Sequence, residues 1–237
     1  MIKLFLSSSF ADVASALPAF AGEPLEGKTV TFIPTASVVE KVTFYVGAGR
    51  TALESLGLVV DELDISAASR EETERKIARN DYIYVSGGNV FYLMQELARS
   101  GAGETIVRAI RGGKPYIGES AGSVILSPDI GYARLMDDPA AAPGLADHAG
   151  LGAIPFHPVP HVGCFPFKKA AQRILDEYGP TLPLLPINNS QAIQVSGDIV
   201  TTVQGTKLKK RKAAKAAMKF LSETSCMQRR IGEPPLT

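Results

Sequence analysis

The sequence predicts a doubly wound α/β fold with a mainly parallel sheet, helices on both faces and a C-terminal β-hairpin. Short apolar runs rich in β-branched residues alternate with segments of helical periodicity, which is the pattern of consecutive βαβ units. The chain has 237 residues, of which 45% are hydrophobic and 21% are charged. It is therefore long and apolar enough to bury a sizeable core, and the same values exclude a disordered chain.

The expected strands are short and rich in valine, isoleucine and aromatic residues. In chain order they cover residues 2–6, 29–33, 58–63, 82–85 and 114–117, followed by the pair 191–195 and 199–203. Gly197 and Asp198 separate that last pair and predict a hairpin turn. Ligands of open parallel sheets bind beyond the carboxyl ends of the strands. Motifs that directly follow a strand are therefore the candidates for function.

The expected helices are bounded by recognisable start and stop signals. Ser69 and Glu72 form a capping box that opens a polar helix. Gly101 follows the helix expected over residues 89–99 and is placed to end it. The other helices are expected over residues 42–56, 105–111, 121–126 and 166–178.

Charge divides the chain into two parts. Residues 1–205 are predicted to form a single α/β domain, and residues 206–237 a basic C-terminal helix and tail. The basic stretch from Lys207 to Lys219 holds seven of the 25 Lys and Arg residues and no acid, although the whole chain carries a net charge of only +1. The α/β domain is therefore net acidic, which argues against a nucleic-acid partner.

The cysteine content indicates a reducing compartment. Cys164 and Cys226 are too few to build a disulfide framework. The apolar start of the chain is too short for a signal-peptide core, and no run approaches the roughly 20 apolar residues of a membrane span. We expect a cytoplasmic protein with no membrane partner.

A G-x-S-x-G pattern, Gly118-Glu119-Ser120-Ala121-Gly122, lies between the strand expected over residues 114–117 and a helix. This is the setting of a nucleophile elbow, a sharp turn that exposes its central serine. Glycines two positions from the serine remove side chains that would clash. The pattern predicts Ser120 as a nucleophile and the Ala121 N–H as an oxyanion donor, whereas an incidental serine in a glycine-rich turn is the simpler alternative.

A second turn, Ser86-Gly87-Gly88-Asn89, follows the strand over residues 82–85. Two glycines let the backbone approach a ligand closely. We expect the Gly88 N–H to be the second oxyanion donor and Asn89 to cap the next helix. Asn89 is also a candidate for substrate contact, as is Glu119, which precedes the nucleophile and could bind a substrate amine or serve only in the structure.

An activated serine needs a base within hydrogen-bond reach and an acid that orients the base. The chain has three histidines, and His148 lies in a polar loop. His157 and His161 are both candidates for the base, and spacing alone does not separate them. The candidate acids, which lie between the serine and the histidines, are Asp129, Asp137, Asp138 and Asp147.

These motifs together resemble the dipeptidase E and cyanophycinase group of serine peptidases, which has a class I glutamine amidotransferase-like fold. The resemblance covers most of the chain up to about residue 195. It rests on the segments 3–8, 32–36, 86–89, 118–123, 150–152 and 160–161. The elbow combined with the Gly-Gly-Asn turn is its most specific part.

The resemblance implies Ser120 as nucleophile, His161 as base, and Gly88 and Ala121 as oxyanion donors. The family's base lies in a Pro-His-aromatic motif, which Pro160-His161-Val162 matches with valine in place of the aromatic residue. It implies Asp137 as the acid, in Asp137-Asp138-Pro139, with Asp138 as the fallback and a dyad if neither reaches His161. Cyanophycinase-like members use a glutamate in a later segment that here reads Asn188-Asn189-Ser190, without a carboxylate.

The predicted function is a serine peptidase of small peptides, of the dipeptidase type, with N-terminal aspartate as a candidate preference. A cation such as Arg134, Lys168 or Lys169 would have to recognise that aspartate, although surface solvation is the better default explanation of these residues. No cofactor and no metal is expected, the partner is a small peptide, and a homodimer is left open. The alternatives are a non-catalytic binding module on the same scaffold, favoured if the acid lies far from His161, and a small-ester hydrolase of the α/β-hydrolase type, favoured by a glycine-rich HGGG-like segment that is absent here.

Overall fold

The computed structural model describes residues 1–208 and contains a seven-stranded sheet in the order β3-β2-β4-β5-β1-β8-β9. The strands from β3 to β1 are parallel, and the β8–β9 hairpin adds two antiparallel strands beside β1. Their bounds are β1 Lys3–Ser7, β2 Thr29–Ile33, β3 Val59–Glu62, β4 Tyr82–Val85, β5 Tyr116–Glu119, β8 Gln191–Ser196 and β9 Ile199–Gln204. This confirms the predicted doubly wound α/β class with its C-terminal hairpin.

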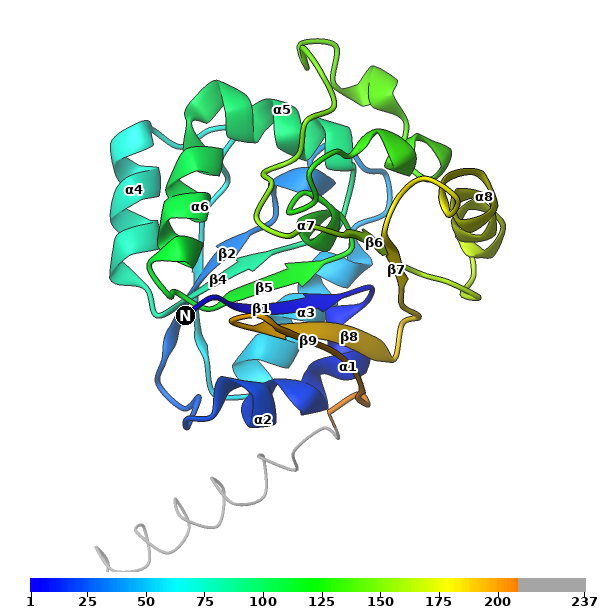
Figure 1. The fold of residues 1–237 in the computed structure, drawn as a ribbon. Coiled ribbons are helices and arrows are strands. Elements are labelled where there is room, and N and C mark those ends of the chain that lie inside the picture. The colour runs from blue at the N-terminus through cyan, green and yellow to red at the C-terminus, as the bar shows by residue number, and fades with distance from the viewer. Residues whose placement is uncertain (209–237) are drawn as a thin grey trace, which may run out of the picture.

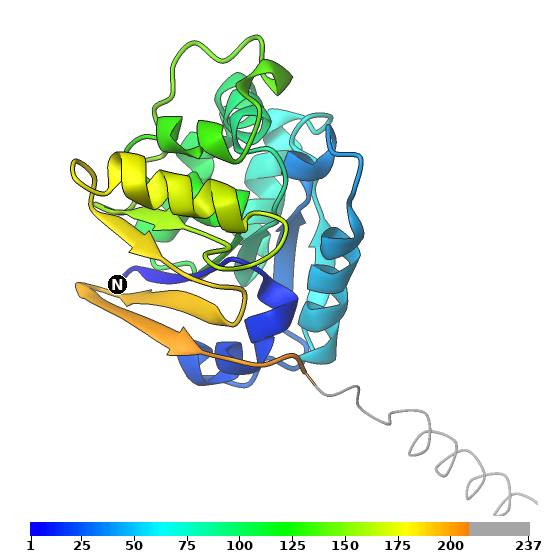
Figure 2. The ribbon, with the colours of Figure 1, turned by 90° about the vertical axis from the view of Figure 1, so that its right-hand side faces the viewer.

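Helices cover both faces of the sheet, as Figure 1 shows. One face carries α4 (Arg70–Arg79), α5 (Val90–Ser100), α6 (Ala102–Arg111) and α7 (Ala121–Val124). The other carries α1 (Phe10–Val13), α2 (Leu17–Ala21) and α3 (Phe44–Ser55). Figure 2 shows the hairpin beyond β1 and, above it, α8 (Lys168–Tyr178), which packs on the separate parallel pair β6 (His157–Val159) and β7 (Leu184–Pro186).

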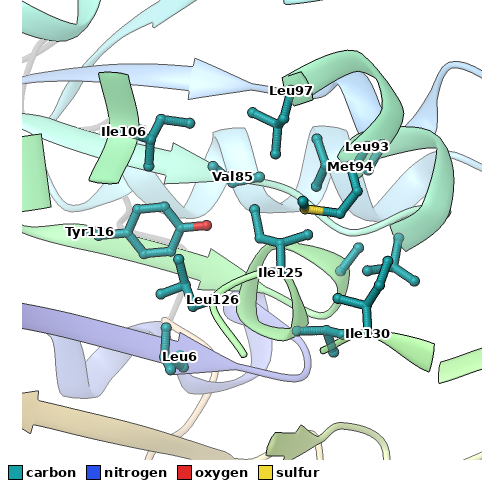
Figure 3. Close-up of a cluster of buried hydrophobic side chains, with 14 of the residues drawn as sticks. Leu6, Val85, Leu93, Met94, Leu97, Ile106, Tyr116, Ile125, Leu126 and Ile130 are labelled. Atoms are coloured by element: carbon teal, nitrogen blue, oxygen red, sulfur yellow. The ribbon is translucent and has the colours of Figure 1, made fainter. Parts of the chain in front are cut away.

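The two faces bury two separate hydrophobic cores. The core on the α5–α7 side lies directly behind the elbow, where Ile125 and Leu126 follow α7 and belong to the same buried cluster as Val85 and Leu93 (Figure 3). Ile125, Leu93 and Val85 are fully buried. Burying each such side chain stabilises the fold by about 1.5–3 kcal/mol. This packing holds α7, and the elbow that precedes it, against the sheet.

Most predicted elements are found within two residues of their expected ends. The caps behave as predicted: the Ser69 hydroxyl accepts from the Glu72 N–H at 3.1 Å, and Gly101 ends α5 in the left-handed conformation. The structure adds α1, α2 and the β6–β7 pair, which were not predicted. Each of these has only three to five residues, too few to show a period.

One expectation falls almost wholly outside this description. The basic helix and tail of 206–237 lie beyond the described residues except for their first three. In that described part Lys207 forms an ion pair with Asp12 at 2.9 Å, and Leu208 packs against the core of the α1–α3 face. No helix within residues 1–208 is both long and apolar enough to cross a membrane.

Candidate active site

The candidate site lies at the carboxyl ends of three neighbouring strands, β4, β5 and β1. Their register aligns Val85 with Gly118 and Ser7 with Glu119, so the three strands end at the same level. The segments that follow carry the Gly87-Gly88 turn, Ser120 and Ser8. This is where a parallel sheet binds its ligands.

Ser120 occupies the sharp turn between β5 and α7 and has φ 48° and ψ −108°. A positive φ is unusual for a residue with a side chain, and such strain persists only where the surroundings impose it. The Ser120 N–H donates to the Ser7 carbonyl at 2.8 Å, which holds the turn against β1. A Cβ at Gly122 would lie 2.2 Å from the Val85 carbonyl oxygen. The elbow therefore requires glycine at this position, as the sequence pattern predicts.

The Gly87-Gly88 turn lies directly beside Ser120. A Cβ built at Gly87 would lie 3.3 Å from Cβ of Ser120, and one at Gly88, where φ is 135°, would lie 2.2 Å from the Ala36 carbonyl oxygen. Within residues 1–208 no backbone carbonyl accepts from the Gly88 N–H. Ala121 opens α7, where a helix leaves its N–H groups without an intrahelical acceptor. Both predicted oxyanion donors are therefore available beside Ser120.

His161 approaches Ser120 from the segment that follows β6. Its Nε2 lies 3.0 Å from the Ser120 Oγ. Its backbone has φ 62°, and its ring stacks on Phe167 with a centroid distance of 4.9 Å. Burial lowers the pKa of His161, and this shift is partly offset by the hydrogen bond that the ring donates to Asn189 and by the charge of Asp12. Burial therefore favours the neutral imidazole, which is able to accept a proton.

Asn189 supplies the hydrogen-bond partner on the other side of the His161 ring. Its Oδ1 lies 2.8 Å from Nδ1 of His161. An amide oxygen only accepts, so Nδ1 carries the proton and the lone pair of Nε2 faces Ser120. Asn189 lies in the turn between β7 and β8. The arrangement Ser120–His161–Asn189 has the geometry of a triad with an amide in the third place, as in the Cys-His-Asn arrangement of papain-like proteases.

The structure does not place Asp137 against His161, so its predicted role as the orienting acid is wrong in this geometry. Its Oδ2 accepts from the Val90 N–H at 3.0 Å, at the start of α5. Burial raises the pKa of Asp137 to about 7, with Glu40 adding to the rise and the Val90 hydrogen bond opposing it. Asp138, the fallback, caps a single helical turn by accepting from the Ala140 N–H at 2.9 Å. Both carboxylates are used to hold local backbone.

The two predicted substrate contacts are also used inside the protein. Asn89 caps α5 by accepting from the Tyr92 N–H at 3.0 Å, and its amide donates to the Asp138 carbonyl at the same distance. Glu119 is buried and points toward the α1–α3 face, where it accepts from the Phe10 N–H at 2.8 Å and from the Tyr84 hydroxyl at 2.6 Å. Strand alternation explains this orientation, because neighbours of Ser120 along β5 face the opposite side of the sheet. The predicted capping role of Asn89 is confirmed.

The other histidines lie apart from Ser120. His157 is buried in β6 with its ring edge-on to Tyr132, and neither ring nitrogen has a hydrogen-bond partner within the described residues. His148 is exposed and packs beside Phe91. Of the three histidines, the structure brings only His161 to the elbow.

Comparison with known proteins identifies the family of the chain. The model of peptidase family S51 matches residues 4–203. The chain belongs to peptidase family S51. It is a serine-type peptidase.

Relatives of this S51 peptidase extend over most of its length. An uncharacterized peptidase of Pasteurella multocida is 52% identical over 198 residues, covering 84% of the chain and 95% of the relative. A Peptidase E of Shewanella amazonensis is 30% identical over 193 residues, covering 78% of each. The crystal structure of a Listeria monocytogenes protein assigned to Peptidase E has a TM-score of 0.81 at 50% identity, covering 86% of the chain and 98% of that structure. A peptidase structure from an acI-B1 Actinobacterium, at 23% identity and a TM-score of 0.62, shares the fold.

Three residues at the S51 site were not predicted from the sequence. The sequence drew attention to Asn189 only because residues 188–190 lack the glutamate that cyanophycinase-like members carry in that segment. The signal that could have identified Asn189 is that it occupies the segment from which those members supply their acid. Phe167 stacks on His161, and the Tyr45 ring lies 3.6 Å from a Cβ built at Gly87. Neither aromatic residue lies in a motif. Within residues 1–208 no three His, Cys, Asp or Glu side chains are grouped as metal ligands.

Proposed function

We propose that this S51 peptidase hydrolyses small peptides through an acyl-enzyme on Ser120, with His161 as the base. The observation that carries the proposal is the 3.0 Å contact between Ser120 Oγ and His161 Nε2 at a strained elbow. Nucleophile and base within this distance, with the base held by a third group, form the general arrangement for covalent catalysis. The neutral state of His161 suits it to accept the proton of Ser120 at neutral pH.

The reaction proceeds in two halves. Ser120 Oγ attacks the scissile carbonyl while His161 Nε2 takes its proton. The Gly88 and Ala121 N–H groups donate to the oxyanion that forms, and His161 returns the proton to the leaving amine. Water, deprotonated by His161, then releases the acyl group and regenerates Ser120.

Asn189 orients His161 in this proposal. Its amide oxygen fixes the Nδ1–H tautomer and the plane of the ring, as an acid does in other triads. Unlike a carboxylate it carries no charge, so it stabilises the imidazolium less. Nearby Asp12 supplies a weaker negative field at His161.

The substrate class is proposed from the relatives and from the cations near the site. Several relatives carry the name Peptidase E, and the notion of a dipeptide with N-terminal aspartate follows from the family resemblance. Lys168 and Lys169 begin α8 directly after Phe167, which stacks on His161, and both are exposed. Arg134 is a weaker candidate for the aspartate because it pairs with Glu177 at 3.0 Å.

A fluorophosphonate probe tests the nucleophile directly. We expect the wild-type protein to be labelled at Ser120 and the Ser120→Ala variant to be unlabelled. Ser127→Ala is the matched control, since Ser127 is a buried serine whose hydroxyl contacts Tyr132 instead of His161. An unlabelled wild-type protein, or labelling that survives in Ser120→Ala, contradicts the proposal.

A dipeptide panel tests the substrate class. Asp-X, Glu-X, Asn-X and Ala-X dipeptides are compared by kcat/KM in the wild-type protein and in Lys168→Ala and Lys169→Ala. A preference for Asp-X over Asn-X that falls in either lysine variant supports recognition of an acidic side chain. Equal rates for Asp-X and Asn-X contradict that preference while leaving the Ser120 mechanism intact.

We also propose that the peptidase works in a reducing compartment such as the cytoplasm. The support is its cysteine usage, since Cys164 and Cys226 are too few to build a disulfide framework. Measuring where a tagged full-length chain fractionates tests this location.

A further inference from the structure

Ser8 links the base to the strand that carries the elbow. It follows β1 directly and is 1% exposed. Its hydroxyl accepts from the His161 N–H at 3.0 Å and donates to the Ile187 carbonyl at 3.1 Å. One buried hydroxyl therefore bonds two segments that are far apart in the sequence.

Those two segments carry His161, the proposed base, and Asn189, its hydrogen-bond partner. The first begins with His161 itself. The second leads from Ile187 to Asn189, whose side chain bonds the His161 ring. The Ile187 carbonyl also accepts from the Val162 N–H at 3.1 Å, so the two segments run together beside Ser8. The Ser8 hydroxyl bonds the backbone on both sides of the His161–Asn189 contact.

The backbone conformation of His161 explains why the hydrogen bond from its N–H to the Ser8 hydroxyl matters. His161 has φ 62°, a value that residues with a side chain rarely adopt, and such backbone persists only where other contacts fix it. Its N–H bonds Ser8, and the ring is then free to bond Ser120 and Asn189. If the hydroxyl is lost, a part-buried N–H loses its acceptor and the strained backbone loses a restraint.

The neighbouring Ser7 holds the other partner of the dyad. The Ser7 carbonyl accepts from the Ser120 N–H at 2.8 Å and from the Ser123 hydroxyl at 2.9 Å. The end of β1 thus contacts the nucleophile through Ser7 and the base through Ser8. The separation of Ser120 Oγ and His161 Nε2 depends on both contacts.

We propose that Ser8 is a positioning residue of the peptidase, which sets the approach of His161 to Ser120 without touching the substrate. This inference rests on the proposed roles of Ser120 and His161. Displacement of a catalytic group by about 1 Å costs roughly a hundredfold in rate. The rate of the chemical step, not the binding of the reagent, should therefore respond to changes at Ser8.

The experiment measures fluorophosphonate labelling of Ser120 as a function of probe concentration, which separates the limiting rate from the half-saturating concentration. The variants are Ser8→Ala and Ser8→Cys. The latter keeps a side chain of similar shape, but its longer, weaker hydrogen bonds should move His161. Thr31→Val is the matched control. The Thr31 hydroxyl is also buried, donates to the Lys76 carbonyl at 3.0 Å and accepts from the Asn80 amide at 2.9 Å, away from the site.

We expect Ser8→Ala to lower the limiting rate about 30- to 100-fold, with the half-saturating concentration changed less than about threefold. Ser8→Cys should be folded and fall between Ser8→Ala and wild type. Thr31→Val should lose thermal stability but keep the wild-type limiting rate. Melting temperatures of all three variants, measured on the same preparations, identify any variant that is not folded.

Two results would overturn the inference on a protein whose wild type is labelled. The first is a wild-type limiting rate in folded Ser8→Ala, or in Ser8→Cys if Ser8→Ala does not fold. The second is a rate loss in Thr31→Val equal to that in the Ser8 variants, which would make the effect one of general stability. An unlabelled wild type instead overturns the proposed function, and the role of Ser8 with it.

Discussion

Ser120 and His161 are the two residues other than glycine that adopt a positive φ within residues 1–208, and their side chains meet at 3.0 Å. They are 41 positions apart in the chain. Backbone strain at both partners of one contact indicates that the surrounding structure imposes it. The hydrophobic core behind α7 packs against the elbow that carries Ser120. The end of β1 bonds Ser120 through Ser7 and His161 through Ser8.

His161 should be essential for turnover, whereas His157 should not. His161→Ala removes the base, and we expect the rate of Ser120 labelling to fall about a thousandfold or more. His157→Phe keeps an aromatic ring against Tyr132 and removes two ring nitrogens that lack partners. It should keep the wild-type labelling rate and a melting temperature at or above that of wild type. The reverse order of effects would assign the base to His157.

Replacing Asn189 should shift the pH dependence of the reaction. In Asn189→Asp a carboxylate faces the Nδ1–H of His161 and favours the imidazolium, so the pKa of His161 rises. The lower midpoint of the pH–rate profile should move upward by roughly 1 to 2 pH units. Asn189→Ala should move the midpoint downward, because the hydrogen bond to Asn189 raises the pKa of His161, and should also lose rate. A profile unchanged in Asn189→Asp would show that Asn189 does not contact the base in solution.

Asp137 should prove dispensable for catalysis. Asp137→Asn keeps an oxygen that accepts from the Val90 N–H and removes the charge. We expect kcat within about threefold of wild type, whereas loss of an orienting acid costs about ten-thousandfold in a triad that depends on it. Steady-state kinetics at pH 7 distinguish the two. A loss of the larger size would restore Asp137 as the third member.

Glu119 should make the stability of the fold depend on pH. Burial raises its pKa to about 7 from an ordinary value of 4.5, against the opposing hydrogen bonds of Tyr84 and Phe10. The native state therefore keeps a proton that the unfolded chain releases between about pH 4.5 and 7. Its contribution to the free energy of unfolding is full below pH 4.5, falls as the pH rises through this range, and is lost above about pH 7.

Urea unfolding of Glu119→Gln from pH 4.5 to 8 measures this contribution. The variant should lack the Glu119 share of the fall seen in the wild type, a difference on the order of 3 kcal/mol across the range. The share of Asp137, whose pKa is also raised to about 7, should remain. Glu104→Gln is the control, since Glu104 is exposed on α6, and it should follow the wild-type curve. Parallel curves for Glu119→Gln and wild type would contradict a raised pKa at Glu119.

Local pattern was sufficient for most of the fold. Strands β2 and β4 have their predicted bounds, because a run of buried apolar residues between turn signals is a local property. The short helices α1 and α2 were not predicted. Their four and five residues are too few to display a helical period, and they form because the chain after β1 must cover the sheet.

The elbow was predictable for the same reason. Gly122 is required because the turn brings the backbone against β4, and the turn is made by five consecutive residues. The G-x-S-x-G pattern therefore predicts the turn directly, because the glycines that the turn requires lie within the same five residues. The Gly87-Gly88 turn is a second local signal, since it too follows a strand directly.

The third member of the site was not predictable in this way. Asn189 and Asp137 both carry side chains able to orient an imidazole, and the family resemblance favoured Asp137. Only the path of the chain through β7 brings Asn189 to His161, and only the packing of α5 directs Asp137 to the Val90 N–H. For Glu119 the sequence left a substrate contact and a structural role open, and its side chain faces the α1–α3 side because successive side chains around the turn at Ser120 lie on opposite faces of the sheet.

The sequence by itself determined the α/β class, the elbow turn at Ser120 and the Gly87-Gly88 turn beside it, because each depends on residues that are adjacent in the chain. The tertiary structure decided the partner of His161 and the anchor at Ser8, because each joins segments that meet only after the sheet is assembled. A hydrogen bond across such a junction depends on strand order and register. Neither is encoded in any short stretch of residues.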